Sequence, residues 1–264
     1  GVFNKAAIRG TMDTLSLSEP TLERSANSFF VPEEEMAIER FLKDGYLIFD
    51  IGDRDILTQV KQMLYASGLE LLNESYTSDL ERFYDRTHEF INPSQLNDFR
   101  VKLIAKMAQN PSLKPAIYKL AKQPLHWLVG NELAMQRNCN LSIQFPGDES
   151  SLLPLHSDVW SGNSPYEVVL WLPLVNCYSS KSMFILPRSK SDDILHNFPD
   201  YSHLTAEALY QKIESDLVWF DVKYGQAAIF SHSLLHGNRV NDELETRWTI
   251  NVRFKSLLSP YGSK

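Results

Sequence analysis

In the first half of the chain, apolar residues recur every three or four positions, which is the spacing of an amphipathic helix. Residues 31–45 (VPEEEMAIERFLKDG) have a proline and three acids in the first turn and a glycine near the end, as helix starts and ends do. Residues 53–68 (DRDILTQVKQMLYASG) repeat the spacing, and Gly68 is expected to close that helix. The same spacing predicts helices over 94–108 and 111–129, the last one broken near Pro124, and the run YLIFDI predicts a short strand over 46–51.

After about residue 132 the pattern changes to short apolar or alternating runs that are separated by turn residues. Such runs are typical of an antiparallel sandwich or a small barrel. They are NLSIQF, LHSDVW, EVVLWLPL, SMFILP, DLVWFDV, QAAIFS and TRWTINVRF. Residues 189–215 interrupt them with polar sequence that becomes briefly helical (TAEALYQKIES), and we expect this segment to form an insertion over one end of the barrel.

Helices followed by strands indicate an α+β fold in which the N-terminal helices pack on one sheet. We expect a single domain over residues 31–264, with a helical half (31–131) and a barrel core (132–258) that contains the 189–215 insertion. Residues 1–30 are expected to be a flexible N-terminal arm, because their first part is rich in Ser and Thr and has little periodicity.

Composition and charge narrow the possible partners. The chain of 264 residues is 43% hydrophobic and 11% aromatic, which is enough for a packed core. A formal charge of −7 argues against a nucleic-acid partner and a polybasic membrane patch, and no apolar run reaches the ~18 residues of a membrane span. Cys139 and Cys177 do not make a disulfide framework. A cytoplasmic protein with a small-molecule substrate is therefore expected, and the sequence leaves the oligomeric state open.

The run LHSDVW places two ionisable residues, His156 and Asp158, in an apolar neighbourhood. On a strand, residues two apart point to the same side, so both side chains would aim at one point. A divalent cation explains such a buried carboxylate beside an imidazole, and two histidines with one carboxylate are typical of non-haem Fe(II) oxygenases. The second histidine could be His232 or His236, which lie close together in SHSLLHGNRVN.

The run TRWTINVRF has two chemically different faces. Arg247, Thr249, Asn251 and Arg253 alternate with Trp248, Ile250, Val252 and Phe254, so the apolar set is expected to face a core. The face with two arginines needs an anion, solvent or polar partners. A guanidinium can bind a carboxylate through two parallel hydrogen bonds, which suits the far end of a dicarboxylate.

Together, HSD, the single histidine of HGNRVN and an arginine eleven positions after it resemble the phytanoyl-CoA dioxygenase superfamily. FLKDGYLIFD, SMFILPRSK and VKYGQAAIFSHSLLHGN are similar to further segments of that family, so the resemblance covers about residues 33–256. It implies a double-stranded β-helix (jelly-roll, cupin-like) core. The long run SLLPLHSDVWSGNSPYEVVLWLPLVN also resembles a subgroup found near bacterial surface-carbohydrate genes.

The resemblance implies Fe(II) and 2-oxoglutarate as cofactor and cosubstrate, O2 as oxidant, and succinate and CO2 as products. It makes His156, Asp158 and His236 the iron ligands, and Arg247 the partner of the distal carboxylate of 2-oxoglutarate. It further implies cosubstrate contacts from Trp171 and Asn238, and Gln144, on the preceding strand, is expected to face the same cavity. Family members that halogenate lack the carboxylate ligand, so the presence of an aspartate indicates oxygenation.

Several alternatives stay open at this stage. His232 is the second candidate for the third ligand, Trp171 could be plain core, and Arg253 is better explained as a salt-bridged structural arginine. The whole site could belong to a non-catalytic metal-binding barrel, such as a sensor or binding module, or to an oxygen-independent cupin-like isomerase or hydrolase.

The expected substrate is a small polar metabolite. No basic patch for the phosphates of a CoA ester is evident, which ranks CoA esters below sugars, nucleotide-linked sugars and other small natural-product intermediates. Segments 73–93 and 189–215 are expected to roof the barrel and to select the substrate. In the first of them, Tyr76, Arg82, Tyr84 and Arg86 are the candidate contacts.

Overall fold

The computed structural model describes residues 29–72 and 79–259. The expected arm over 1–30 therefore lies almost entirely outside the described residues. The helical half consists of α1 (Pro32–Asp44), α2 (Arg54–Leu71), α3 (Leu80–Asp85), α4 (Thr87–Phe90), α5 (Pro93–Gln109) and α6 (Leu113–Val129), with strand β1 (Tyr46–Asp50) between the first two helices. Each of the described helices is too short or too polar to cross a membrane.

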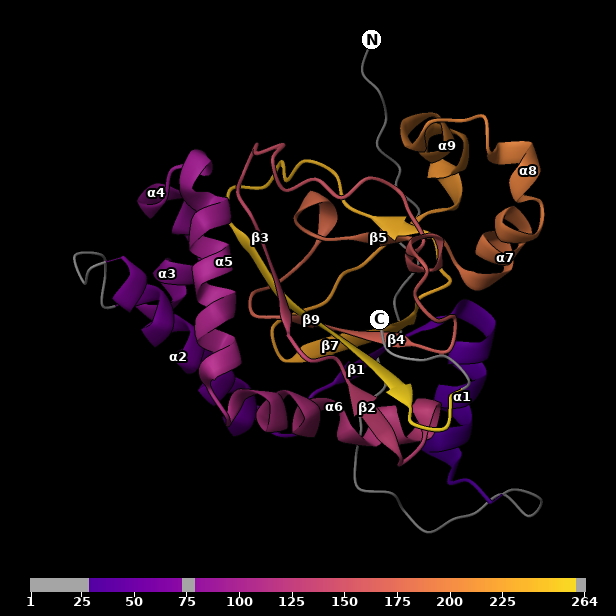
Figure 1. Cartoon of the computed structure of the whole chain (residues 1–264), viewed down its shortest axis with the longest axis horizontal. Coiled ribbons are helices and arrows are strands. Elements are labelled where there is room, and N and C mark those ends of the chain that lie inside the picture. The colour runs from indigo at the N-terminus through magenta and orange to yellow at the C-terminus, as the bar shows by residue number, and fades with distance from the viewer. Residues whose placement is uncertain (1–28, 73–78, 260–264) are drawn as a thin grey trace.

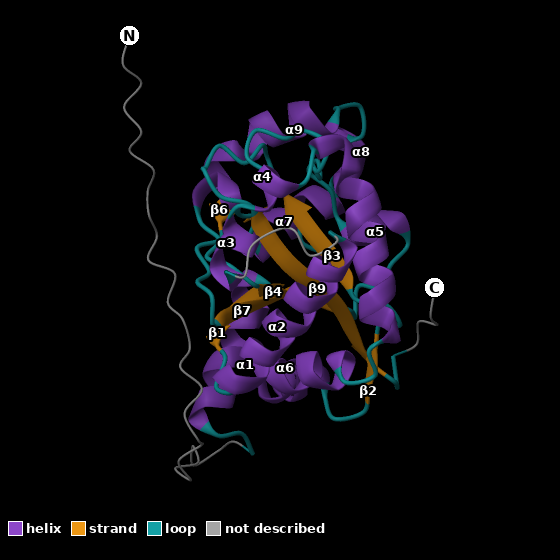
Figure 2. Cartoon of the chain, turned by 90° about the vertical axis from the view of Figure 1, so that its left-hand side faces the viewer, coloured by secondary structure: helices purple, strands orange, loops and turns teal. Residues whose placement is uncertain are grey.

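Most strands join one antiparallel sheet, whose order is β1-β7-β4-β9-β2, with β3 also paired to β9. The helices of the first half lie across one side of this sheet (Figures 1 and 2), and they share one apolar core with it. The strands are β2 (Leu133–Met135), β3 (Asn140–Gln144), β4 (Val168–Pro173), β7 (Gln226–Ser231) and β9 (Arg247–Ser256). The α+β prediction, with N-terminal helices on one sheet, is confirmed.

A smaller antiparallel sheet has the order β6-β5-β8 and lies beside helices α7–α9 (Figure 1). Its strands are very short: β5 (Phe184–Ile185), β6 (Val218–Trp219) and β8 (His236–Gly237). The 189–215 segment, expected to be polar and only briefly helical, forms α7 (Arg188–His196), α8 (Phe198–Tyr201) and α9 (Ala206–Ile213). Ile194, Leu209 and Ile213 from these helices pack with Phe184 and Leu186 in a second apolar cluster.

Strand β9 separates the core from a polar cavity. Trp248, Ile250 and Val252 are fully buried, and the alternate residues, from Arg247 to Arg253, line the cavity on the other face. The predicted division of this strand into two faces is confirmed. It follows from the period of two along a strand, because the register of β9 with β3 and β4 turns every second side chain toward the helices.

Two helix boundaries differ from the prediction. Helix α2 continues through Gly68 to Leu71, so this glycine is not a C-terminal cap. Its missing side chain serves packing instead, because a Cβ at Gly68 would lie 2.5 Å from Cζ of Phe83. Helix α6 is not broken near Pro124, which is buried within it.

The run LHSDVW does not form the predicted strand. His156 makes one isolated bridge to His236, and a 3₁₀ helix (Asp158–Ser161) begins immediately afterward. The expected convergence of His156 and Asp158 therefore arises from a strand bridge followed by a tight turn rather than from strand alternation.

The expected roof over 73–93 is wrong for residues 79–93, none of which lines the cavity. Residues 73–78, including Tyr76, lie outside the described residues. Tyr84 is fully buried, donates a hydrogen bond to the carbonyl of Lys61 and contacts the ring of Trp248 edge-on. Because Trp248 is on the core face of β9, α3 packs on the side away from the cavity.

We predict that Thr87→Val lowers the free energy of unfolding by about 1–3 kcal/mol, the usual cost of an unsatisfied buried donor. The Thr87 hydroxyl is the acceptor for Nε1 of the fully buried Trp248, at 2.8 Å. Thr87→Ser keeps the hydroxyl and removes one methyl group, so it should lose about 1 kcal/mol or less. Urea denaturation measures both, and a larger loss in the serine variant would contradict the assigned role.

Candidate metal centre and cosubstrate cavity

His156, Asp158 and His236 converge on one point. Each offers one ligand atom, and the three atoms lie within 4.8 Å of one another. Asp158 Oδ1 is 3.9 Å from Nε2 of His156, and its Oδ2 is 4.0 Å from Nε2 of His236. Reciprocal backbone hydrogen bonds of 3.0 and 2.9 Å between His156 and His236 hold the two histidines opposite each other.

In both histidines the Nε2 atom faces the aspartate and is unprotonated, which is the form that binds a metal. Nδ1 of His156 is 2.8 Å from the carbonyl oxygen of Pro154, and Nδ1 of His236 is 2.9 Å from that of Leu234. A carbonyl only accepts, so the proton of each neutral ring is on Nδ1 and the Nε2 lone pair is free for a cation. Burial and the neighbouring His156 lower the pKa of His236 to about 4, which keeps it neutral near pH 7. This donor set fits a divalent cation such as Fe(II).

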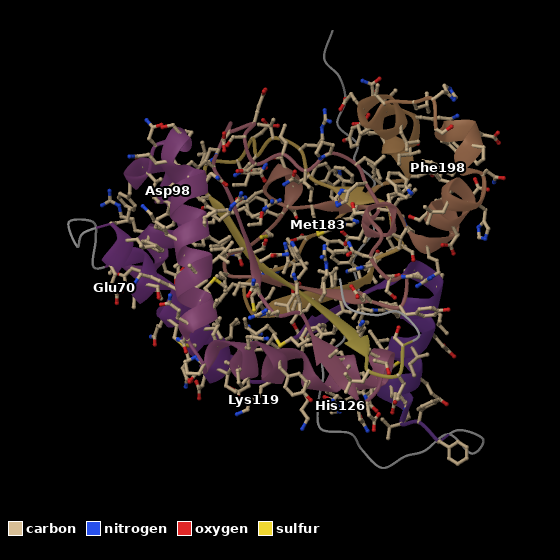
Figure 3. All side chains as sticks on the ribbon, in the orientation of Figure 1. Glu70, Asp98, Lys119, His126, Met183 and Phe198 are labelled. Atoms are coloured by element: carbon tan, nitrogen blue, oxygen red, sulfur yellow. The ribbon has the colours of Figure 1, made fainter. Side chains whose placement is uncertain are left out.

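The three side chains open into a cavity of about 370 Å³. Its lining comes from β3, β4, β9, the 150–153 loop and helix α5. Met183, also in the lining, lies near the middle of the view in Figure 3. Ligands that enter the cavity therefore lie beside the cluster of two histidines and one aspartate.

Arg247 lies in the same cavity as a buried cation. Its side chain is 3% exposed and donates to the carbonyl of Ser182 at 2.7 Å and to Oγ of Ser142 at 3.1 Å. Burial lowers its pKa to about 10, so it stays charged. Within the described ranges no carboxylate pairs with it, and its Nε has no hydrogen-bond partner. A buried cation without a counter-ion is costly, so this site favours an anionic ligand.

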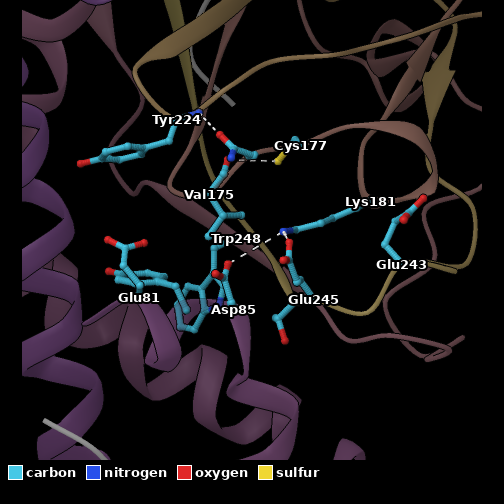
Figure 4. A network of polar contacts seen from close by, with 12 residues as sticks. Glu81, Asp85, Val175, Cys177, Lys181, Tyr224, Glu243, Glu245 and Trp248 are labelled. Carbon is cyan, nitrogen blue, oxygen red and sulfur yellow. Dashed lines mark hydrogen bonds and ion pairs between the residues drawn. The ribbon is translucent and has the colours of Figure 1, made fainter. Parts of the chain in front are cut away.

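A half-buried ion pair between Lys181 and Glu245 (Figure 4) joins the segments that carry Ser182 and Arg247. Nζ of the fully buried Lys181 is 2.6 Å from Oε2 of Glu245 and 3.9 Å from Oδ1 of Asp85. Lys181 directly precedes Ser182, whose carbonyl accepts from Arg247, and Glu245 is two residues before Arg247 in the chain. The pair thus fixes both the arginine and its acceptor.

Of the remaining predicted cosubstrate contacts, two line the cavity and one does not. Trp171 lines the cavity and packs edge-on against Phe220, so it is both a core residue and a wall residue. Asn238 also lines the cavity, and its side-chain oxygen accepts from the backbone N–H of Leu153. Gln144 lies outside this lining, and its amide donates to the carbonyl of Arg239 at 2.7 Å.

His232 lies next to Asp158 but is not part of the three-residue cluster. The side chain is fully buried, with Nε2 3.6 Å from Oδ2 of Asp158 and Nδ1 3.5 Å from Oε2 of Glu167. Arg253, predicted to be salt-bridged, is 3.3 Å from Oδ1 of the same aspartate. Asp158 is therefore flanked by a histidine and an arginine in addition to the two candidate ligands.

The sequence motifs missed several lining residues, among them Arg100, Gln136, Asn140 and Ser142. Arg100 is on α5, in the helical half, where no motif sets it apart from other surface cations. Asn140 and Ser142 alternate with buried Leu141 and Ile143, so their place on the polar face of a strand was the available signal.

No family model matches the sequence, and no curated protein matches it. Solved structures do match. AviO1 from Streptomyces viridochromogenes Tue57 shares 16% identity over 87% of this chain and 98% of its own, with a TM-score of 0.53. EctD from S. alaskensis, solved with bound Fe, shares 15% identity over 89% of this chain and 79% of its own, with a TM-score of 0.54.

A third match is SnoK, a non-haem α-ketoglutarate-dependent carbocyclase from nogalamycin biosynthesis. It shares 14% identity over 84% of this chain and 83% of its own, with a TM-score of 0.50. None of the comparisons bears on the resemblance to a surface-carbohydrate subgroup. The chain has the double-stranded β-helix fold of non-haem iron oxygenases similar to phytanoyl-CoA dioxygenase, as the sequence resemblance implied.

Proposed function

We propose that the protein is an Fe(II)- and 2-oxoglutarate-dependent dioxygenase that hydroxylates a C–H bond of a small polar metabolite. The observation that carries the proposal is the combination, in one cavity, of two Nε2 donors and a carboxylate with a buried arginine that has no carboxylate partner among the described residues. A metal-binding module without 2-oxoglutarate has no need for the buried cation.

Different residues of the cavity would bind the iron and the cosubstrate. His156, Asp158 and His236 would hold the iron, and Arg247 would bind the distal carboxylate of 2-oxoglutarate in the fixed orientation that Ser142 and Ser182 give its guanidinium. When bound, iron with its cosubstrate supplies an oxidation in which substrate, 2-oxoglutarate and O2 give hydroxylated substrate, succinate and CO2. Trp171, Val169 and Phe230 form apolar wall that limits the access of water to the site.

A sugar or nucleotide-linked sugar is the substrate class proposed from the polar lining of the cavity. Gln136, Asn140, Ser150, Ser151 and Asn251 give it both hydrogen-bond donors and acceptors. Succinate release measured against a metabolite panel, followed by a mass increase of one oxygen atom in the product, tests the activity. Anaerobic Fe(II) with 2-oxoglutarate should give a weak visible charge-transfer band, and correctly folded protein without the band would contradict the proposal.

We predict that His236→Asn lowers Fe(II) affinity by more than about 100-fold, because it removes a coordinating nitrogen. His232→Asn is the matched control and should lower it by no more than about 10- to 100-fold, the usual effect of losing a residue that supports a ligand. Anaerobic Fe(II) titration followed by metal analysis measures both affinities. Loss of iron only in the His232 variant would make His232 the third ligand instead.

Arg247→Met should raise the 2-oxoglutarate concentration for half-maximal succinate release by about 30-fold or more, since removing the partner of a buried charge costs about 2 kcal/mol or more. Arg247→Lys retains the charge but loses the planar guanidinium. Its half-maximal 2-oxoglutarate concentration should lie between those of the methionine variant and the unchanged protein. An unchanged requirement in the methionine variant would remove Arg247 from the cosubstrate site.

Lys181→Met should raise the half-maximal 2-oxoglutarate concentration by about fivefold. Losing the ion pair would loosen the Ser182 carbonyl, whose hydrogen bond with Arg247 contributes about 1 kcal/mol. Lys61→Met is the matched control, since Lys61 is also a buried lysine paired with a glutamate, at 2.8 Å from Glu81, and does not line the cavity. Steady-state kinetics with varied 2-oxoglutarate measures the effect. Equal shifts in the two variants would show general destabilisation rather than positioning of Arg247.

A further inference from the structure

We propose that the substrate is a small organic anion whose carboxylate or phosphate group is bound by Arg100 and Arg253 in the metal-centre cavity. This inference rests on the proposed function, because it takes iron and 2-oxoglutarate as the other occupants of the cavity. It narrows the proposed substrate class to acidic sugars, sugar phosphates and comparable small acids, and it excludes neutral sugars.

The first support is the charge that remains in the cavity. Its charged lining residues are Arg100, Arg247, Arg253 and Asp158, which is three cations against one carboxylate. The two positive charges of Fe(II) and the two negative charges of 2-oxoglutarate cancel. The lining residues therefore still carry a net charge of two positive units when both are bound. The chain as a whole has a formal charge of −7, so this excess is local. An anionic substrate would neutralise it in a partly desolvated site, where a charge is most costly to leave unpaired.

The second support is the surroundings of Arg253. Its Nη2 is 3.3 Å from Oδ1 of Asp158, and its side chain is 32% exposed. That contact uses one of the five N–H donors of the guanidinium. A metal bound to Asp158 would share the same carboxylate, so the attraction between Asp158 and Arg253 is weakest when the centre is loaded. The arginine is then available to a second anion beside the reacting site.

The third support is Arg100, which enters the cavity wall from helix α5. Its Nη2 donates to the neutral side-chain oxygen of Asn97 at 2.7 Å, and among residues 29–72 and 79–259 no carboxylate forms an ion pair with it. The nearby acid on the same helix, Asp98, pairs with Lys102 instead. Helix α5 packs on β3, and β3 pairs with β9. The two arginines thus come from elements on either side of β3.

Uncharged amide groups in the same lining suit an oxyanion. Asn140 and Asn251 are register partners on β3 and β9, and both line the cavity with Gln136. Their amides can donate to oxygen atoms of an anion without adding charge. A volume of about 370 Å³ is near the lower end for small-molecule sites, which favours a compact substrate beside 2-oxoglutarate.

The test measures whether small anions bind close to the metal. Protein loaded with Mn(II) in place of Fe(II), and saturated with 2-oxoglutarate, is titrated with inorganic phosphate in one arm and with 13C-labelled acetate in the other. The paramagnetic ion shortens the relaxation times of 31P or 13C nuclei that bind close to it. We expect saturable enhancement in at least one arm, and the arm that responds tells a phosphate-binding from a carboxylate-binding site.

Arg100→Gln and Arg253→Gln should each weaken the binding of that anion by about tenfold, as expected when a charge-assisted contact is lost. Arg100→Lys should retain most of the binding. The matched control is Arg239→Gln, because Arg239 is an exposed arginine paired with Glu207 and outside the cavity. Circular dichroism checks that each variant is folded.

Two results would overturn the inference: no enhancement in either arm with the loaded protein, or equal enhancement in the Arg100→Gln variant. Binding of Mn(II) and of 2-oxoglutarate is measured before any anion is added. Failure at that earlier stage would count against the proposed oxygenase, whereas normal loading without anion binding would count against the anionic substrate alone.

Discussion

Strand β9 is paired along both edges, with β4 on one side and with β2 and β3 on the other, and the register of this pairing fixes which of its side chains face the helices. A slip of one residue would move Trp248 into the cavity and bury Arg247 in the apolar core. Since burying an uncompensated guanidinium among apolar side chains is costly, the register is strongly determined. The cavity, its arginines and the packing of the helical half all depend on it.

The metal cluster depends on a second pairing, the isolated bridge between His156 and His236. Its two backbone hydrogen bonds join segments that are eighty residues apart in the chain. The carbonyls of Pro154 and Leu234 then set the ring tautomers, so the side chains are arranged for a cation by the backbone that carries them. The tight turn that starts at Asp158 adds the carboxylate.

Charged groups that surround this centre are distributed unevenly. Lys181 and Glu245 neutralise each other in the segments next to Arg247, and Glu167 lies beside His232, whose pKa burial lowers to about 4. Facing the cavity, by contrast, cations outnumber carboxylates. The protein has a net negative charge, but its cavity is cationic and therefore suited to binding anions. 2-Oxoglutarate would be one of these anions and the proposed substrate a second.

The sequence by itself determined the helical first half, the β-rich second half and the two faces of β9, because each follows from local periodicity. Motif spacing left His232 and His236 as alternatives, and the resemblance to the phytanoyl-CoA dioxygenase superfamily implied His236 together with His156, Asp158 and Arg247. Only the tertiary structure decided that α2 runs through Gly68 beneath Phe83, that LHSDVW forms a bridge and a turn, and that Tyr84 packs in the core. It also decided that Arg100 reaches the cavity and that Gln144 does not. These outcomes depend on contacts between residues far apart in the chain, which neither hydrophobic spacing nor residue type can specify.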